Sequence, residues 1–341
     1  MVDVMTPCAS HLPLVKLIAT GGTIAMKYNA AGASVPAIDG DDLLEAVPAI
    51  ADLASVEVDN FSNIPSGYMS PQHWLALYQH VQEALANDDI EAVIISHGTD
   101  SLEETAFFLD LTLSSDKPVI MVGAQHNAAS EEGDGPANLL DAVRVAVSQS
   151  ARGCGVLVVM NHKILTARDV LKVHTRNRVG FDAYEYQKAG VIDQGSVRFD
   201  CADNSKGLDQ SRQTVVLEDK TLAANQLPRV DIIAMYAGAE GDLITAAVAA
   251  GAQGLVIQAL GAGNVNQGMY AAIQAAIGSG VAVVISTRVP HGGVMPAYGY
   301  EGGGKTLVDC GALLSGGLSP QKARILLMLG LQSGRDLAGL F

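Results

Sequence analysis

The chain has 341 residues, of which 49% are hydrophobic and 17% are charged. This length is sufficient for about two globular domains, and the composition excludes both a disulfide-stapled mini-protein and a largely disordered chain. Thirty-six acidic against 21 basic side chains give a formal charge of −15, which repels phosphate backbones and anionic lipid surfaces, so we expect neither nucleic acid nor a membrane as a partner.

The cysteine pattern and the apolar runs indicate the compartment. Four cysteines are scattered without a C-x-x-C pair, which predicts neither a zinc site nor a redox dithiol. No stretch reaches the roughly 18 apolar residues of a membrane span, and the first residues lack the pattern of a secretory signal. We therefore expect a cytoplasmic protein.

Short apolar runs alternate with segments of helical period in the first half of the chain. Helix starts are predicted at Ser70-Pro71, at Pro136 and at Ser101, where Glu104 completes a capping box. Strands and helices in alternation predict a parallel sheet with right-handed crossovers. The predicted strands cover residues 14–19, 92–96, 119–123 and 156–160.

The pattern is interrupted by a polar stretch between about residues 200 and 228 and then restarts. We therefore predict an α/β fold with a larger N-terminal parallel-sheet domain at 1–208, a linker at 209–228 and a smaller C-terminal α/β domain at 229–341. The second domain has predicted strands at 230–235, 254–259 and 281–286, and predicted helices at 240–250, 268–279 and 319–332.

Two hydroxyl-bearing loops directly follow predicted strands. Residues 20–25 read Thr-Gly-Gly-Thr-Ile-Ala, and residues 97–100 read His-Gly-Thr-Asp. Ligands of parallel sheets bind at the carboxyl ends of the strands, so we expect both loops to face one crevice. The alternative is that Thr20 and Thr23 only satisfy turn and cap hydrogen bonds.

A threonine becomes a nucleophile only when a base or a cation assists it. The segment after the fourth predicted strand offers Arg168, Asp169 and Lys172, and a partly desolvated lysine can serve as a base. Backbone N–H groups at residues 21 and 22 and at Ala124 are candidates for an oxyanion hole. These groups fit acyl transfer on a small amide or ester.

Two other patterns lead to weaker predictions. Residues 299–306 match the phosphate-loop pattern G-x-x-x-x-G-K-[ST], but no strand precedes them and Gly311 interrupts the segment after them, so we predict no nucleotide site. The histidines lack metal-ligand spacing, which argues against a metal site. His97 is predicted to be a packed loop residue.

At residues 20–25 and 97–105 the chain resembles the bacterial-type L-asparaginase/glutaminase family. Residues 118–124 with Asp134-Gly135-Pro136, and residues 319–324, agree with it, so the resemblance extends from about Leu14 to Phe341. It implies a two-domain amidohydrolase that converts L-asparagine to L-aspartate and ammonia. It further implies a homotetramer built as a dimer of dimers, and no metal or cofactor.

The resemblance also implies residue roles. Thr23 would be the nucleophile that forms an acyl-enzyme. Thr99, Asp100 and Lys172 would form a second triad, in which Lys172 withdraws the proton of Thr99 and Asp100 binds the substrate ammonium. Ser66 would contact the substrate carboxylate.

Two further contacts are implied by the same resemblance. Ala124 would offer a backbone contact to the amide, and Asn266 would approach the neighbouring site across a dimer interface. Tyr28, the only tyrosine in the loop 26–37, and Glu301 are the candidates to complete the first triad.

The chain departs from the family pattern at several places. The loop after Thr23 is short, with Tyr28 several residues from where the family's catalytic tyrosine lies, and the loop 291–306 around Glu301 differs in length and is rich in glycine. Gly67 stands where the family commonly has Gln, and Gln125-His126 stands where many relatives have Met-Arg. With Gly67, one contact to the substrate ammonium is missing or is supplied by another residue. The same chemistry on L-glutamine, a D-amino acid amide or another small amide is therefore an alternative, and a non-catalytic amino-acid sensor is another.

Overall fold

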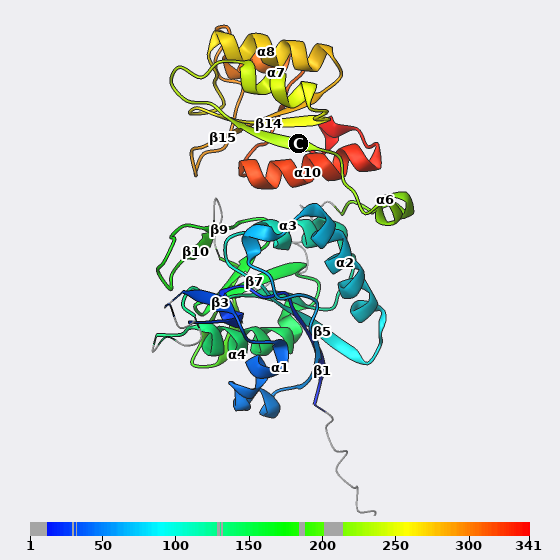
Figure 1. Ribbon diagram of the computed structural model, residues 1–341, viewed down its shortest axis with the longest axis vertical. Helices are drawn as coiled ribbons and strands as arrows, with labels where there is room; N and C mark the ends of the chain where they lie inside the picture. Colours follow the sequence, from blue (N-terminus) through cyan, green and yellow to red (C-terminus); the bar gives the residue numbers. More distant parts are fainter. Residues whose placement is uncertain are drawn as a thin grey trace, which may run out of the picture.

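The computed structural model describes residues 12–28, 31, 33–127, 130, 132–183, 188–200 and 214–341. Two α/β domains are stacked along the long axis of the molecule, and the larger one is built from the first part of the chain (Figure 1). The parallel-rich sheet of the larger domain and the parallel sheet of the smaller one confirm the predicted fold class. Among the helices described, none is long and apolar enough to cross a membrane.

The N-terminal domain is organised around an eight-stranded sheet with the order β12-β11-β8-β7-β6-β5-β1-β4. The strands from β4 to β7 are parallel, and β8, β11 and β12 extend the sheet with each strand antiparallel to its neighbour. The strands are β1 (Leu14–Ala19), β4 (Ser55–Asp59), β5 (Ile90–Ser96), β6 (Val119–Val122), β7 (Val156–Met160), β8 (Lys163–Thr166), β11 (Gly190–Asp193) and β12 (Ser196–Phe199).

The antiparallel extension, which the sequence patterns do not predict, results from turn chemistry. Asn161 and His162, with φ of 49° and 60°, form the two-residue connection between β7 and β8. Two successive residues in the left-handed region are typical of a type I′ hairpin turn, which reverses the chain without a helix. Gln194 and Gly195 make the same kind of connection between β11 and β12.

Alternate residues of the parallel strands face two apolar cores. Val93 and Ile95 pack with α2 and α3, whereas Ala92 and Ile94 face the opposite core with α1 and α4. Because both faces are covered, the strands read as continuous apolar runs. The helices are α1 (Gly40–Glu45), α2 (Pro71–Ala86), α3 (Leu102–Thr112) and α4 (Gly135–Ala146).

Several short elements complete the first domain. Two small antiparallel pairs, β2 with β3 and β9 with β10, lie outside the main sheet. Their bounds are β2 (Met26–Tyr28), β3 (Ser34–Pro36), β9 (Val170–Lys172) and β10 (Phe181–Ala183), and the 3-10 turns are η1 (Thr23–Ala25), η2 (Pro48–Asp52), η3 (Ser66–Tyr68) and η4 (Gln149–Ala151).

The C-terminal domain has a four-stranded parallel sheet in the order β13-β14-β15-β16. Helices α7 and α8 share an apolar core with one face of this sheet, and α10 packs on β13, β14 and β15 and also contacts α3 of the first domain. The elements are β13 (Val230–Ala234), α7 (Asp242–Ala249), β14 (Gly254–Ala259), α8 (Gln267–Gly278), β15 (Ala282–Thr287), α9 (Gly304–Asp309), β16 (Leu313–Leu314), α10 (Pro320–Ser333) and η5 (Leu337–Gly339).

Two predictions from the sequence concern the connections. Residues 201–213 of the polar stretch lie outside the described residues, and the remainder of the predicted linker contains the short helix α6 (Asp219–Ala224). No strand directly precedes the phosphate-loop match at 299–306, since β15 ends at Thr287, and the match leads into the six-residue α9. A phosphate loop normally joins a buried strand to a long helix.

Candidate active site

The first threonine loop begins where β1 ends. Thr20 donates hydrogen bonds to the carbonyl oxygen of Ser96 from both its N–H and its hydroxyl, at 3.1 and 2.9 Å. Gly22 has a φ of 85°, and a Cβ at this position would lie 2.1 Å from the Cα of Gly98. Only glycine can occupy such a position. The loop is thus held directly against the second threonine loop.

Thr23 stands at the start of η1 and is half-buried. Unlike Thr20, it makes no hydrogen bond through its hydroxyl with any residue that the structure describes. The interpretation that both threonines only satisfy turns therefore fits Thr20 and does not fit Thr23.

The second loop contains a threonine in contact with a lysine. Thr99 is 5% exposed, and the Lys172 Nζ donates hydrogen bonds to its Oγ1 at 2.9 Å and to the Asp100 carboxylate at 2.7 Å. Seventy-three positions separate Lys172 from Thr99. The fold thus brings together the hydroxyl, the carboxylate and the amine expected from the sequence.

A buried carboxylate fixes the backbone beneath this lysine. Glu103, on the first turn of α3, accepts the Lys172 N–H at 2.6 Å. Burial raises the pKa of the Glu103 carboxyl, while the ammonium groups of Lys322 and Lys172 oppose that rise. Reasoning from the sequence misses Glu103, because an acidic residue in a first helical turn also occurs as a simple dipole partner.

Ser66 joins the site from η3. Its Oγ accepts the N–H of Asp100 at 3.2 Å, and its carbonyl oxygen accepts the hydroxyl of Ser101 at 2.7 Å. The predicted capping box at Ser101 is therefore wrong, because the hydroxyl binds η3 and makes no capping bond to α3. Gly67 is exposed, and nothing lies within 4 Å of a Cβ built on it.

The loop after β6 closes a third side of the site. A Cβ on Gly123 would lie 3.3 Å from the Thr99 Cγ2, and the next residue, Ala124, is fully buried. The Asp134 carboxylate accepts the N–H groups of Gln125 and His126 at 3.1 and 2.9 Å.

Gln125 and His126 also have a structural role. The Gln125 Nε2 donates to the carbonyl oxygens of His174 and Asn177, both at 3.1 Å, and the His126 Nε2 donates to that of Arg176 at 3.0 Å. These bonds tie the third loop to the turn that follows Lys172.

His97 is fully buried, as predicted. Its Nδ1 donates to the carbonyl oxygen of Gly98 at 2.8 Å, and its Nε2 accepts from the hydroxyl of Thr105, to which the Trp74 indole also donates. Burial lowers the pKa of His97 to about 4. The ring is therefore neutral at physiological pH and supports the loop without exchanging protons.

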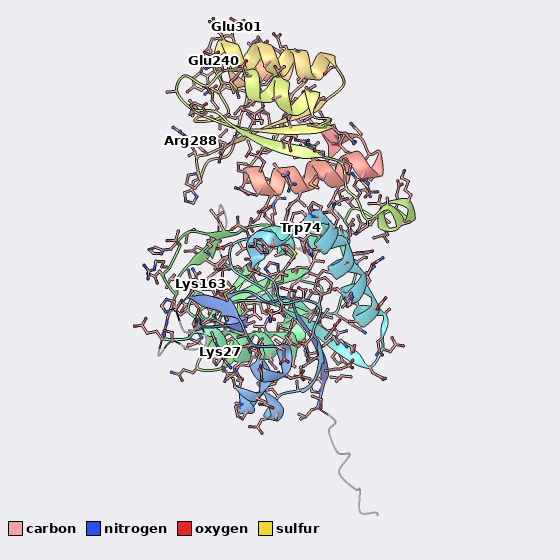
Figure 2. All side chains as sticks on the ribbon, in the orientation of Figure 1. Lys27, Trp74, Lys163, Glu240, Arg288 and Glu301 are labelled. Carbon is pink, nitrogen blue, oxygen red and sulfur yellow. The ribbon has the colours of Figure 1, made fainter. Side chains whose placement is uncertain are left out.

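Glu301 and Asn266 are not gathered around the threonines within one chain. Tyr28 ends β2, and its side chain lies outside the described residues. Glu301 is exposed on the C-terminal domain, where its carboxylate accepts a hydrogen bond from Gln267 at 3.0 Å. Figure 2 shows Glu301 at the far end of that domain from Trp74, whose indole lies beneath the second threonine loop.

Asn266 is occupied as the N-cap of α8. Its Oδ1 accepts the N–H of Met269 at 2.9 Å, and its Nδ2 donates to the carbonyl oxygen of Ala239 at 2.7 Å. Both ends of the carboxamide are thus engaged inside the C-terminal domain. Among the described residues, no group of three His, Cys, Asp or Glu side chains is placed to hold a metal ion.

Comparison with known proteins identifies the family. Residues 14–204 match the model "Asparaginase, N-terminal", and residues 229–340 match "Glutaminase/Asparaginase C-terminal domain". The chain is 36% identical to L-asparaginase 2 of Bacillus subtilis, over 95% of this chain and 84% of the relative. It is also 36% identical to L-asparaginase 2 of Escherichia coli, over 96% and 91%.

A solved structure agrees along nearly the whole length. The probable cytoplasmic L-asparaginase from Campylobacter jejuni superposes with a TM-score of 0.84 and 34% identity, covering 96% of this chain and 97% of that one. Matches of this extent, together with the paired threonine loops, establish that the chain belongs to the asparaginase family.

Proposed function

We propose that this chain hydrolyses L-asparagine to L-aspartate and ammonia through a threonine acyl-enzyme. The observation that carries the proposal is the Lys172 ammonium within hydrogen-bond distance of both Thr99 Oγ1 and Asp100. The names of the relatives, L-asparaginase in each case, support the same substrate.

In the first half-reaction the Thr23 oxygen attacks the side-chain amide carbon. The carbon–nitrogen bond breaks, the hydroxyl proton leaves with the nitrogen as ammonia, and an ester to Thr23 remains. A Thr23 hydroxyl without a partner among the described residues supports this role. Backbone donors near Ala124 would bind the carbonyl oxygen as it becomes negative.

In the second half-reaction a water molecule attacks the ester. Thr99 would take a proton from that water as its own proton passes to Lys172, and the Thr23 oxygen leaves with a proton as L-aspartate forms. Lys172 would accept this proton as it passes one of its own protons to the Asp100 carboxylate. The 2.7 Å contact between Lys172 and Asp100 supports this transfer. The low exposure of Thr99 supports this assignment, because burial strengthens the interaction with the ammonium.

Asp100 and Ser66 are proposed to hold the two charged ends of the substrate. The Asp100 side chain is 75% exposed, so the carboxylate is accessible to the substrate ammonium. Ser66 and the backbone of Gly67 lie on the same side, since Ser66 Oγ binds the Asp100 N–H, and would receive the substrate carboxylate.

A second copy of the chain is proposed to complete the site, in a homotetramer built as a dimer of dimers. The placement of Glu301 and Asn266 in the C-terminal domain supports this proposal, in which another copy brings them to Tyr28 and Thr23. The Campylobacter structure is named a probable cytoplasmic L-asparaginase, which supports the cytoplasmic location proposed here.

The test is ammonia release from L-asparagine by the wild type and by Thr23→Ala and Thr99→Val. Each variant is expected to lose about 10³-fold or more in kcat, because each removes an oxygen that forms or transfers a bond in the reaction. Thr20→Val is the matched control, since its hydroxyl only binds Ser96. Unchanged kcat in either of the first two variants would overturn the role of that residue.

Hydrolysis of L-glutamine is the second candidate, because Gly67 has no side chain where the family commonly has Gln, which changes the contacts to the substrate ammonium. Comparing kcat/KM for L-asparagine, L-glutamine and the D-amides separates the candidates. Tight L-asparagine binding without turnover would instead indicate an amino-acid sensor.

A further inference from the structure

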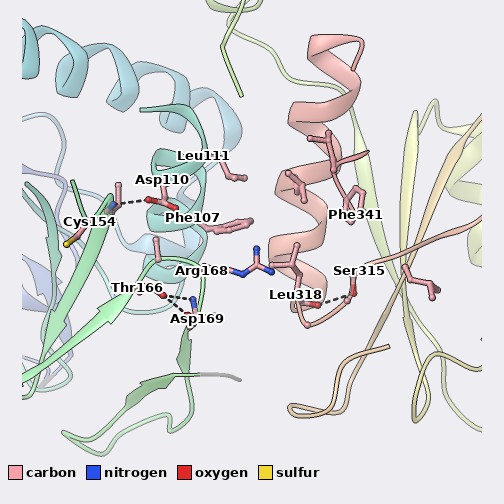
Figure 3. Close-up of a pocket in the computed structure, with 17 residues that line it drawn as sticks. Phe107, Asp110, Leu111, Cys154, Thr166, Arg168, Asp169, Ser315, Leu318 and Phe341 are labelled. Atoms are coloured by element: carbon pink, nitrogen blue, oxygen red, sulfur yellow. Dashed lines mark hydrogen bonds between the residues drawn. The ribbon is translucent and has the colours of Figure 1, made fainter. Parts of the chain in front are cut away.

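A cavity lies between the two domains, apart from the proposed threonine site (Figure 3). Its volume is about 570 Å³, within the range of roughly 300–1,000 Å³ typical of small-molecule sites. Neither threonine of the proposed site nor Lys172 lines it. The N-terminal wall comes from α3 and the β8–β9 turn, and the C-terminal wall comes from the segment before α10 and the residues after it.

The cavity contains an arginine, Arg168, whose guanidinium has no acceptor among the described residues. Arg168 lies in the β8–β9 turn, and its carbonyl oxygen accepts a hydrogen bond from Lys322. Its guanidinium, by contrast, makes no hydrogen bond or ion pair with the described chain. Figure 3 shows the guanidinium extending across the cavity toward Leu318. Arg168 is exposed, so water reaches its guanidinium, which is charged at every physiological pH and offers five donors to a ligand that enters the cavity.

The opposite wall supplies two more donors. Two hydrogen bonds close the turn from Ser315 to Leu318. The Leu318 N–H donates to the Ser315 carbonyl oxygen at 3.1 Å, and the Ser315 hydroxyl donates to the Leu318 carbonyl oxygen at 3.2 Å. The N–H groups of Gly316 and Gly317 have no acceptor among the described residues. Gly316 has a φ of 59°, and successive N–H groups in such a turn form an anion-binding concavity.

The other charges and the apolar lining restrict the ligand. Asp169 accepts the Thr166 hydroxyl at 2.8 Å and Asp110 accepts the Val156 N–H at 2.9 Å, so two carboxylates already lie on the wall with Arg168. A doubly charged phosphate would be repelled by them, whereas a single carboxylate matches the guanidinium fork. Phe107 and Leu326 provide an apolar surface for an organic body.

We propose that this interdomain cavity binds a small organic monocarboxylate with an apolar body, whose carboxylate lies between the Arg168 guanidinium and the amides of Gly316 and Gly317. The ligand would touch both domains at once. Such binding is separate from the proposed hydrolysis, and nothing in it requires the chain to turn over an amide.

Isothermal titration calorimetry on the full chain tests the proposed binding of a monocarboxylate in this cavity. The three probes are 3-phenylpropanoate, 2-phenylethylamine and inorganic phosphate. The titrations are repeated with saturating L-aspartate, so that any carboxylate binding at the threonine site is blocked. We expect 3-phenylpropanoate to bind once per chain with or without L-aspartate. The amine and phosphate are expected to bind about 10- to 100-fold more weakly, the value of a charged hydrogen-bonded pair.

Arg168→Gln removes the charge and should weaken 3-phenylpropanoate binding by about 10- to 100-fold. Arg168→Lys keeps the charge and should restore part of the affinity. Arg198→Gln, at an arginine on β12 that does not line the cavity, is the control and should bind as the wild type does. Melting temperatures establish that all variants are folded. Absence of saturable binding by the wild type, displacement by L-aspartate, or equal affinity in Arg168→Gln would overturn the proposal and leave the hydrolysis proposal unaffected.

Discussion

The Nζ of Lys322, at the start of α10, donates a hydrogen bond of 2.8 Å to the carbonyl oxygen of Arg168 in the other domain. The same ammonium also donates to the carbonyl oxygen of Val170, and it lies 5.9 Å from the centre of the Phe107 ring. Burial lowers the pKa of Lys322 to about 8, although Glu103 opposes this shift. A buried cation from the second domain thus holds the strand that contains Lys172.

Replacing this cation should weaken the fold. Lys322→Met leaves Glu103 and two carbonyl oxygens without their cation, and we expect a loss of about 3 kcal/mol in the free energy of unfolding. Lys322→Arg keeps the positive charge and should recover part of the lost free energy of unfolding. Chemical denaturation measures the change.

Lys305→Met is the control for this measurement. Lys305 forms an ion pair with Asp309 on the surface of α9, and its replacement should change stability by less than about 0.5 kcal/mol. A loss in Lys322→Met no larger than that of the control would contradict the anchoring role of the buried ammonium.

Lys172 should matter for turnover and little for folding. Lys172→Met removes the donor to Thr99 and Asp100, and kcat for L-asparagine is expected to fall by about 10³-fold. The backbone bond to Glu103 remains, so the melting temperature should change little. Lys163→Met, which breaks a surface pair with Asp182, is the control. Full activity in Lys172→Met would contradict the proposed second half-reaction.

The buried His97 should make the wild type sensitive to acid. An unfolded histidine takes up a proton near pH 6.5, but the pKa of the folded ring is only about 4, so the unfolded state binds more protons between these values. Stability therefore falls as the pH drops through this window. Between pH 7 and pH 5 the wild type should lose about 2 kcal/mol more than His97→Gln. Urea denaturation at both pH values measures the difference, and equal losses would refute the buried neutral ring.

The contact between the threonine loops should tolerate no side chain at Gly22. An alanine Cβ would lie 2.1 Å from Gly98 Cα on a backbone with a φ of 85°, so Gly22→Ala should lose at least about 2 kcal/mol of stability and most of the activity. Gly278→Ala is the matched control, because nothing lies within 4 Å of a Cβ there. Similar denaturation midpoints for the two variants would be inconsistent with the close packing of the loops.

The parts of the molecule that depend on local patterns are the easiest to predict from the sequence. The strand at Leu14–Ala19 and the helix start at Ser70-Pro71 are found in the structure, because apolar periodicity and a cap are properties of adjacent residues. Asn161 and His162 show where this reasoning stops. Neither is a glycine, so the left-handed turn that reverses the sheet has only a weak local signal.

In the candidate active site, too, some features follow from local sequence patterns and others depend on the whole fold. Motifs at strand ends identify Thr23 and Thr99 as candidates, but the distance from Lys172 to Thr99 depends on a crossing of the sheet that no spacing rule gives. The cap prediction at Ser101 is wrong because a hydroxyl can satisfy either a helix end or a neighbouring loop, and only the fold decides between them. Glu301 lies away from the threonines because the expected site residues are divided between two domains.

The position of Lys322 in the chain has a consequence for synthesis. The ribosome releases the threonine loops and Lys172 long before it releases the start of α10, so a nascent first domain exists for a time without the ammonium that holds Arg168 and Val170. In nascent chains stopped before residue 322, β9 would therefore be held by β10 and by the Glu103 carboxylate without the ammonium, and its contacts with Arg168 and Val170 would form only when α10 emerges and docks.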